Sequence, residues 1–172
     1  MSTAGIIISM NKYLLLSLIY CSSVFAAQNY TITFPKDWSV KENSFGADYF
    51  AYSPIIIDKD SASFFVKEYA ADIKDPLDFI QNDIEKNILK NSKKYKNLNI
   101  YSKKNITLNK RVFSVVEYYY FDNTQDKIIF SQIAILKNNS KYIYFNLAGN
   151  EATFKEYKDD AETMMKTLKL NP

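Results

Sequence analysis

The sequence predicts an α+β fold, in which a mainly antiparallel central sheet has helices packed on both faces in an α/β/α sandwich. Three runs rich in β-branched and aromatic residues, at 112–121, 127–136 and 142–148, are separated only by short polar segments. Such spacers suit antiparallel neighbours, because a parallel crossover needs about a dozen residues or more. A strongly amphipathic helix pattern follows the third run.

The run at 127–136 is the reason to expect covering layers on both sides of the sheet. Ile129, Ile133 and Ile135 share one face of the expected strand, and the opposite face is also apolar. A strand that is apolar on both faces usually lies inside a sheet covered on both sides. The sheet should therefore be buried at its centre.

Shorter strand patterns account for the rest of the sheet. Residues 30–40 are expected to form a strand, a proline turn and a return that buries Trp38. Further strands are predicted at 48–52, 62–69, 98–101 and 105–108, with a turn at Asn109-Lys110 that leads into the three long runs.

Two amphipathic helices are predicted. The first begins at Asp75-Pro76, because Asp is a favoured N-cap and Pro is favoured at the first helical position, and it should fray past Leu89. The second begins at Asn150 or at Thr153. The buried stripe of the first contains Leu77, Ile80, Ile84 and Ile88, and that of the second contains Phe154, Tyr157, Ala161, Met164, Met165 and Leu168.

The first 26 residues are typical of an export signal. Lys12 gives a positive start, residues 13–20 are apolar, and residues 24–26 form a small-residue cleavage site. Met10 is a better candidate initiator than Met1, because a compact signal begins there. The apolar run is too short for a membrane-spanning helix, so we expect an exported protein, periplasmic or secreted and not transmembrane after cleavage.

Residues 27–172 are expected to form a single domain, which is long enough to build a core without cross-links. The only cysteine, Cys21, lies in the expected leader, and Tyr20 before it is too large for a bacterial lipidation signal. We therefore expect neither disulfide bonds nor a lipid anchor in the mature domain.

Histidine is absent from the whole chain. Without histidine, and without cysteine in the mature domain, Ser-His-Asp and Cys-His nucleophile systems, thiol redox chemistry and the usual zinc sites are excluded. Three glycines in the chain argue against phosphate-binding loops. The sequence predicts no catalytic, cofactor-binding or metal-binding residue, and we expect that the protein is not an enzyme.

Two features of the run at 112–121 have structural interpretations. Tyr118, Tyr119 and Tyr120 alternate between the two faces of a strand and so cannot form one recognition surface. Glu117 lies among apolar neighbours and is interpreted as a surface or paired residue, rather than as a general acid with a raised pKa.

The order of these elements resembles the Mog1/PsbP-like fold, an α/β/α sandwich. The resemblance rests on the residues 34–38 (Phe-Pro-Lys-Asp-Trp), on the antiparallel meander, and on residues 144–168, which close the chain with a helix. The family includes the extrinsic photosystem II protein, the Ran-binding protein Mog1 and bacterial envelope proteins of the DcrB type. The resemblance implies a non-enzymatic domain that docks onto other macromolecules, often at a membrane.

One stretch has an uneven charge. From residue 86 to residue 111 there are nine basic residues and no acidic one. Such a stretch could attract an anionic membrane, an acidic polysaccharide or an acidic protein surface, or it could be a solvated loop that keeps the domain soluble. Nucleic acid is not expected, because its recognition modules are absent. The candidate partner-binding residues are Lys86, Lys90, Lys93, Lys94, Tyr95, Lys96, Tyr101, Lys103, Lys104, Lys110 and Arg111.

These observations favour an exported, non-enzymatic binding or assembly protein of the cell envelope that docks on a protein or membrane partner. Two alternatives stay open. One is a secreted effector or surface factor of a host-associated bacterium. The other, less favoured, is a carboxylate-based hydrolase, which would require paired acidic side chains in a cleft.

Overall fold

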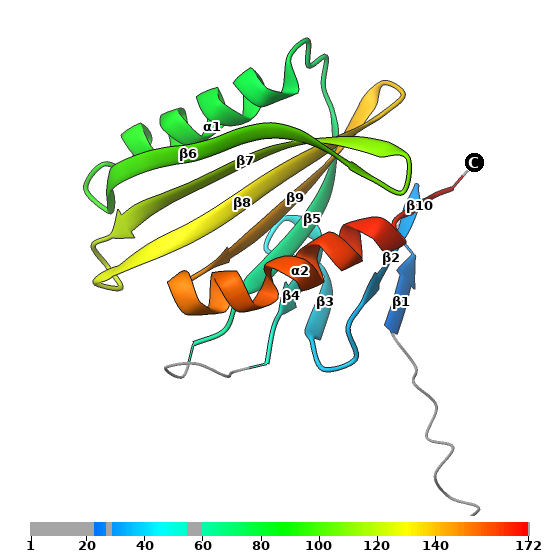
Figure 1. Cartoon of the computed structure of the whole chain (residues 1–172), viewed down its shortest axis with the longest axis horizontal. Helices are drawn as coiled ribbons and strands as arrows, with labels where there is room; N and C mark the ends of the chain where they lie inside the picture. Colours follow the sequence, from blue (N-terminus) through cyan, green and yellow to red (C-terminus); the bar gives the residue numbers. More distant parts are fainter. Residues whose placement is uncertain (1–22, 27–28, 55–59, 172) are drawn as a thin grey trace, which may run out of the picture.

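The computed structural model describes residues 23–26, 29–54 and 60–171, which form two sheets and two helices (Figure 1). The larger sheet has seven strands in the order β3-β4-β5-β9-β8-β7-β6, and every neighbouring pair is antiparallel. These strands are β3 (Ser39–Ser44), β4 (Ala47–Tyr52), β5 (Ser63–Ala70), β6 (Tyr95–Leu108), β7 (Arg111–Asp122), β8 (Lys127–Asn138) and β9 (Lys141–Gly149). The predicted antiparallel sheet is therefore confirmed.

Helix α1 (Pro76–Lys90) packs on one face of this sheet, which we call the α1 face. Asp75 caps it as predicted, with its carboxylate accepting the N–H groups of Leu77 and Asp78. Ile80 and Ile84 are buried in one cluster with side chains from β7, β8 and β9. Because α1 contacts β6 and β7, it lies over one half of the sheet (Figure 1).

Helix α2 (Glu151–Thr167) packs on the other face. Of the two predicted starts, Asn150 is the cap, and its side chain accepts the N–H of Thr153. The predicted stripe is buried against Val115, Phe145 and their neighbours on the sheet. A second, three-stranded sheet of β1 (Ser23–Ala26), β2 (Tyr30–Phe34) and β10 (Lys169–Leu170), in the order β1-β2-β10, supplies further residues to this core.

Strand β8 is buried on both faces, as its sequence predicts. Ala134 and Leu136 belong to the core beneath α2, whereas Ile133 and Ile135 belong to the core beneath α1. Alternate side chains of a strand point to opposite faces, so one strand supplies both cores.

Residues 30–40 form a strand, a turn and a return that buries Trp38, but the two strands lie in different sheets. Strand β2 pairs with β1 and β10 in the small sheet, whereas β3 joins the edge of the large sheet. Trp38, between them, is buried as predicted, and its Nε1 donates a 3.2 Å hydrogen bond to Asp160 of α2. Trp38 is thus held beneath α2 at the point where the chain passes from the small sheet to the large sheet.

The two short strands expected at 98–101 and 105–108 are one continuous strand, β6. Its pairing with β7 is irregular between Lys96 and Asn99 and between Ile100 and Ser102. Such bulges allow a polar segment to stay paired at a sheet edge, where lysines are common. The turn at Asn109-Lys110 is confirmed, with φ of 47° and 63° at the two residues. A two-residue hairpin turn of type I′ needs this left-handed backbone at both positions.

The predicted leader falls almost entirely outside the described residues. Only its last part, Ser23–Ala26, is described, as strand β1 paired with β2. Neither helix of the described part is long and apolar enough to cross a bilayer.

Candidate functional site

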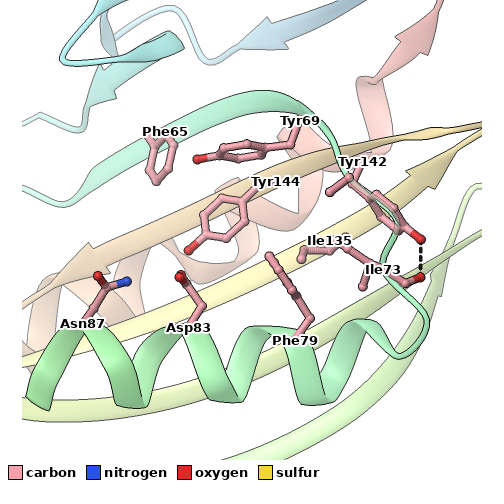
Figure 2. A pocket seen from close by; sticks show the side chains of 10 residues that line it. Phe65, Tyr69, Ile73, Phe79, Asp83, Asn87, Ile135, Tyr142 and Tyr144 are labelled. Atoms are coloured by element: carbon pink, nitrogen blue, oxygen red, sulfur yellow. Dashed lines mark hydrogen bonds between the residues drawn. The ribbon is translucent and has the colours of Figure 1, made fainter.

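A groove of about 340 Å³ lies on the α1 face, between α1 and strands β5 and β9 (Figure 2). It exists because α1 lies over β6 and β7 and leaves this part of the sheet open to solvent. We call it the aromatic groove. Its lining residues are Phe65, Tyr69, Ala71, Ile73, Phe79, Asp83, Asn87, Ile135, Tyr142 and Tyr144.

The helix supplies one wall of the aromatic groove. Phe79, Asp83 and Asn87 follow one another at intervals of four residues, so they lie in a row along α1, beside the buried stripe that contains Ile80 and Ile84. Figure 2 shows this row pointing toward the aromatic side chains of the sheet. The wall thus combines one ring, one carboxylate and one amide.

The sheet supplies the aromatic wall. Phe65 and Tyr69 of β5 and Tyr144 of β9 point away from the core beneath α2. The ring of Tyr144 lies 5.3 Å from that of Phe65 and 5.9 Å from that of Tyr69, measured between centroids. At one end the hydroxyl of Tyr142 donates to the carbonyl of Ile73, which closes the groove (Figure 2).

Two tyrosines of the groove, Tyr69 and Tyr144, have raised pKa values. Burial, helped by Tyr118, Asp83 and Tyr69, raises the pKa of Tyr144 well above its usual value. Burial and the nearby Asp83 also raise the pKa of Tyr69. At neutral pH these side chains, like ordinary tyrosines, are uncharged and offer hydroxyl groups and ring faces.

Asp83 is the one carboxylate among the groove's lining residues. It is half-buried, and within the described part of the chain no side chain forms an ion pair or hydrogen bond with it. Its negative charge is thus available to a ligand.

The groove continues toward the C-terminal end of α1. A second hollow of about 130 Å³ shares Asp83, Asn87 and Tyr144 with it, and extends to Tyr95 and Tyr120. The predicted separation of the three consecutive tyrosines is confirmed here. Tyr118 and Tyr120 stack on the α1 face, whereas Tyr119 contacts Phe130 beneath α2.

Beyond β5, the open part of the α1 face stays aromatic. Phe50 contacts Tyr52 on the same strand and Phe45 in the β3–β4 turn, with ring centroids 4.8 Å and 5.1 Å apart. Phe45 is 74% exposed, and its backbone is left-handed, with a φ of 54°. A left-handed backbone is unusual for a bulky residue, and here it belongs to the tight turn between Ser44 and Ala47. An exposed aromatic patch is often an interaction site.

The structure separates the basic residues that the sequence places in one stretch. Five lysines lie at the C-terminal end of α1 and the start of β6, and they form what we call the lysine end. Strand β6, with its 14 residues, spans about 45 Å, so the residues at its far end are distant from this cluster. The lysine end consists of Lys86, Lys90, Lys93, Lys94 and Lys96.

No side chain in the described ranges forms an ion pair with the lysine end. Two of its ammonium groups lie over aromatic rings instead, that of Lys94 over Tyr95 at 5.0 Å and that of Lys96 over Phe121 at 4.9 Å. These lysines are therefore available to an anionic group, and Tyr95 connects them to the groove.

The remaining basic residues of the stretch make contacts within the fold. Lys103 forms a 3.4 Å ion pair with Asp78 of α1, and Lys104 lies 3.7 Å from Glu117 on the opposite face. Arg111 donates to the carbonyl of Leu168, at the end of α2. Lys110 lies in the turn before it, and Tyr101 contacts Tyr119 on the α2 side of the sheet.

Glu117 is paired, in agreement with its sequence interpretation. Its carboxylate lies 2.8 Å from Lys158 of α2 and accepts a hydrogen bond from Gln132. Burial alone would raise its pKa, but Lys158, Gln132 and Lys104 together lower it. This carboxylate is held ionised within the fold and does not line the groove.

Sequence reasoning missed the aromatic groove. Its signal is the presence of aromatic residues at the positions of β5 and β9 that alternate with the core, together with the four-residue spacing of Phe79, Asp83 and Asn87. The arrangement suits binding. It has aromatic walls, hydroxyl groups and one unpaired charge, but no second carboxylate that could share acid–base work with Asp83.

The sequence matches no protein-family model and no curated protein sequence. Solved structures are similar. The solution structure of cyanobacterial PsbP (CyanoP) from Synechocystis sp. PCC 6803 has a TM-score of 0.64 at 15% identity, covering 89% of this chain and 94% of that one. LpqN of Mycobacterium tuberculosis, described as involved in cell envelope biogenesis, has a TM-score of 0.58 at 14% identity, covering 88% and 86%. PA94 of Pseudomonas aeruginosa, described as a protein of unknown function and putative regulator, has a TM-score of 0.54 at 12% identity, covering 88% and 98%.

Proposed function

Starting from the Mog1/PsbP-like fold of this chain, we propose that it is an exported, non-enzymatic binding protein of the cell envelope, an α/β/α sandwich that docks on a protein partner through its α1 face. The observation that carries the proposal is the aromatic surface that α1 leaves uncovered. It runs from Phe45 through Phe50 and Phe65 to the groove beside Asp83.

This surface supports docking because exposed aromatic side chains dominate the energetics of protein interfaces. A monomeric protein rarely leaves such side chains together in solvent without a partner. On the opposite face, α2 and the small sheet bury most of the aromatic residues, although Tyr101, Tyr119 and Phe121 are partly exposed near β6.

The lysine end supports an acidic partner. Its lysines form no ion pair with described residues. Lys94 lies over Tyr95, where the groove opens at the end of α1, whereas Lys96 lies over Phe121 on the α2 side of the sheet. Charges at the rim of an interface steer association more than they add to affinity, and they make association sensitive to salt.

Two further considerations support the envelope. The first 26 residues read as an export signal. The similar structure LpqN is described as involved in cell envelope biogenesis. Fold alone does not fix function, so the proposal depends chiefly on the surface.

The carboxylate-based hydrolase receives no support from the site. A glycosidase needs two carboxyl groups across the scissile bond. The aromatic groove contains Asp83 alone, and Glu117 is held in an ion pair on the other side of the sheet.

The test is a crosslinking pull-down from envelope extract with the domain 27–172 as bait. Phe45→Gly removes an exposed ring and also suits the left-handed backbone at this position, so it should not impair folding. We expect it to weaken capture of the partner that the unmodified domain retains. Unchanged capture by Phe45→Gly would contradict docking through this surface.

The lysine end is tested separately by the triple change Lys93/Lys94/Lys96→Glu. The matched control is Lys155/Lys166/Lys169→Glu, which makes the same charge change on α2 and β10. We expect loss of capture with the first variant only. Equal loss in both variants would show that net charge, rather than the lysine end, drives the association.

A further inference from the structure

We propose that the aromatic groove binds a small organic cation, an alkylammonium or quaternary ammonium group, with Asp83 as its counter-charge and the rings of Phe65, Tyr69 and Tyr144 as its walls. This goes beyond docking on a partner, because it assigns a small-molecule site to the same face. It is tested with a different probe, so either proposal can fail alone.

The size of the groove suits a small ligand. Sites for small molecules occupy about 300–1,000 Å³, and the groove measures about 340 Å³. Its walls come from α1, β5, β8 and β9, and the hydrogen bond from Tyr142 to Ile73 holds one end closed. A bound group would therefore be enclosed on several sides by the side chains drawn in Figure 2.

The charge of the groove selects a cation. Asp83 is half-buried and, among the described residues, has no ionic or hydrogen-bonding partner. A neutral ligand that covered it would remove the carboxylate from water without replacing its interactions, which is costly. An anionic ligand would be repelled, whereas an ammonium group would supply the missing charge.

The rings of the groove suit the same ligand. A cation is attracted to the face of an aromatic ring when it lies within about 6 Å of the centroid. The molecule already shows this contact at the rim, where the ammonium of Lys67 lies 5.3 Å from the centroid of Tyr69. The rings of Phe65, Tyr69 and Tyr144 line the groove together, with the Tyr144 centroid 5.3 Å from that of Phe65 and 5.9 Å from that of Tyr69.

Lys67 should therefore compete with an external cation for the ring of Tyr69. It lies opposite Tyr144 in the register of β5 and β9, and it uses one face of Tyr69. Removing its charge should free that face and remove a like charge near the ligand. A variant without this charge should therefore bind the organic cation more tightly.

The experiment compares choline with 3,3-dimethylbutan-1-ol, its uncharged isostere, by isothermal titration calorimetry on the domain 27–172. We expect choline to bind at least about tenfold more tightly than the alcohol, because only choline completes the charge pair and the ring contacts. Lys67→Ala should tighten choline binding.

Asp83→Asn should weaken choline binding about tenfold or more and leave the alcohol unaffected. The matched control is Glu85→Gln, which removes one negative charge from the exposed side of the same helix, outside the groove. Near-UV circular dichroism confirms that each variant is folded. Equal affinity for the two probes, no choline binding, or the same loss in both variants would overturn the proposal.

Discussion

Asp83 on α1 and Tyr144 on β9 face each other across the aromatic groove (Figure 2). The carboxylate adds to the effect of burial, which is the largest cause of the raised pKa of the tyrosine. A free charge and a neutral phenol thus lie side by side in the open half of the α1 face. The sheet and α1 hold this pair in place, because one hydrophobic core packs α1 on the sheet and a second core packs α2 on its other face.

The pH dependence of stability follows from this arrangement. Because the folded pKa of Tyr144 is raised, its neutral form is favoured in the folded state, and this contribution is fully present below the unfolded value of about 10. Above pH 10 the unfolded chain loses the proton first, so the free energy of unfolding should fall by about 1.4 kcal/mol per pH unit for this group.

Urea unfolding between pH 8 and pH 11.5 measures the effect. Tyr144→Phe should flatten the alkaline decline relative to the unmodified protein. Tyr101→Phe is a comparison variant: burial raises the pKa of Tyr101 to about 12, so below that pH it should flatten the decline in the same direction, and a difference from Tyr144→Phe should appear only above it. Identical declines in the unmodified protein and in Tyr144→Phe would contradict the assignment.

The buried carboxylate Glu117 should stabilise the fold. Glu117→Gln leaves Lys158 without its 2.8 Å ion pair and should lower the free energy of unfolding by about 1–3 kcal/mol. The pKa of Glu117 is lowered in the fold, so its contribution is present above the unfolded pKa and is lost as the pH falls through the folded pKa.

Acid unfolding monitored by circular dichroism checks this sign. Glu117→Gln should be less stable than the unmodified protein at pH 7, and the difference should shrink below pH 4. Glu151→Gln, whose ion pair with Lys155 is exposed, is the control and should change stability little. A constant difference across the pH range would argue against the ionised pair.

The β6–β7 turn should tolerate glycine better than lysine. Lys110 has a left-handed backbone, with a φ of 63°, and an Asn-Gly pair is favoured in a type I′ turn. Lys110→Gly should therefore stabilise the domain by about 1 kcal/mol. Lys110→Ala keeps the Cβ and should give no such gain, and equal thermal shifts for both variants would show that the side chain, rather than the backbone, matters.

Export should leave a protein that starts at Ala27. Strand β1 would then be lost, but β2 keeps its pairing with β10 and its buried residues Tyr30, Ile32 and Phe34. We expect a mature mass that corresponds to residues 27–172 in the periplasm or the medium. The thermal midpoints of proteins 23–172 and 27–172 should be similar, whereas a large drop would indicate that β1 belongs to the working fold.

Local sequence signals predicted the elements that they control directly. Asp75 followed by Pro76 marks the start of α1, and Asn150 was one of two candidates for the start of α2. The three long antiparallel strands could be predicted because each is longer than the turns that join it and carries a clear apolar pattern.

Long-range arrangement could not be predicted in the same way. No local signal indicates that β2 belongs to the small sheet whereas β3 belongs to the large one, because this depends on how Trp38 packs beneath α2. The basic stretch is continuous in sequence but divided in space, because β6 is long and carries Lys103 and Lys104 to opposite faces. The groove needs residues from four elements, and its position depends on where α1 lies on the sheet.

The central claim, that the α1 face is the docking surface, is tested most directly inside the cell. A photo-crosslinking benzoylphenylalanine placed at Phe79, which is 41% exposed on the wall of the groove, would report what lies against it. The matched position is Glu156, exposed on the outer side of α2. We expect a discrete crosslinked adduct from position 79 and none from position 156. An adduct from position 156 alone, or none from position 79, would contradict the account.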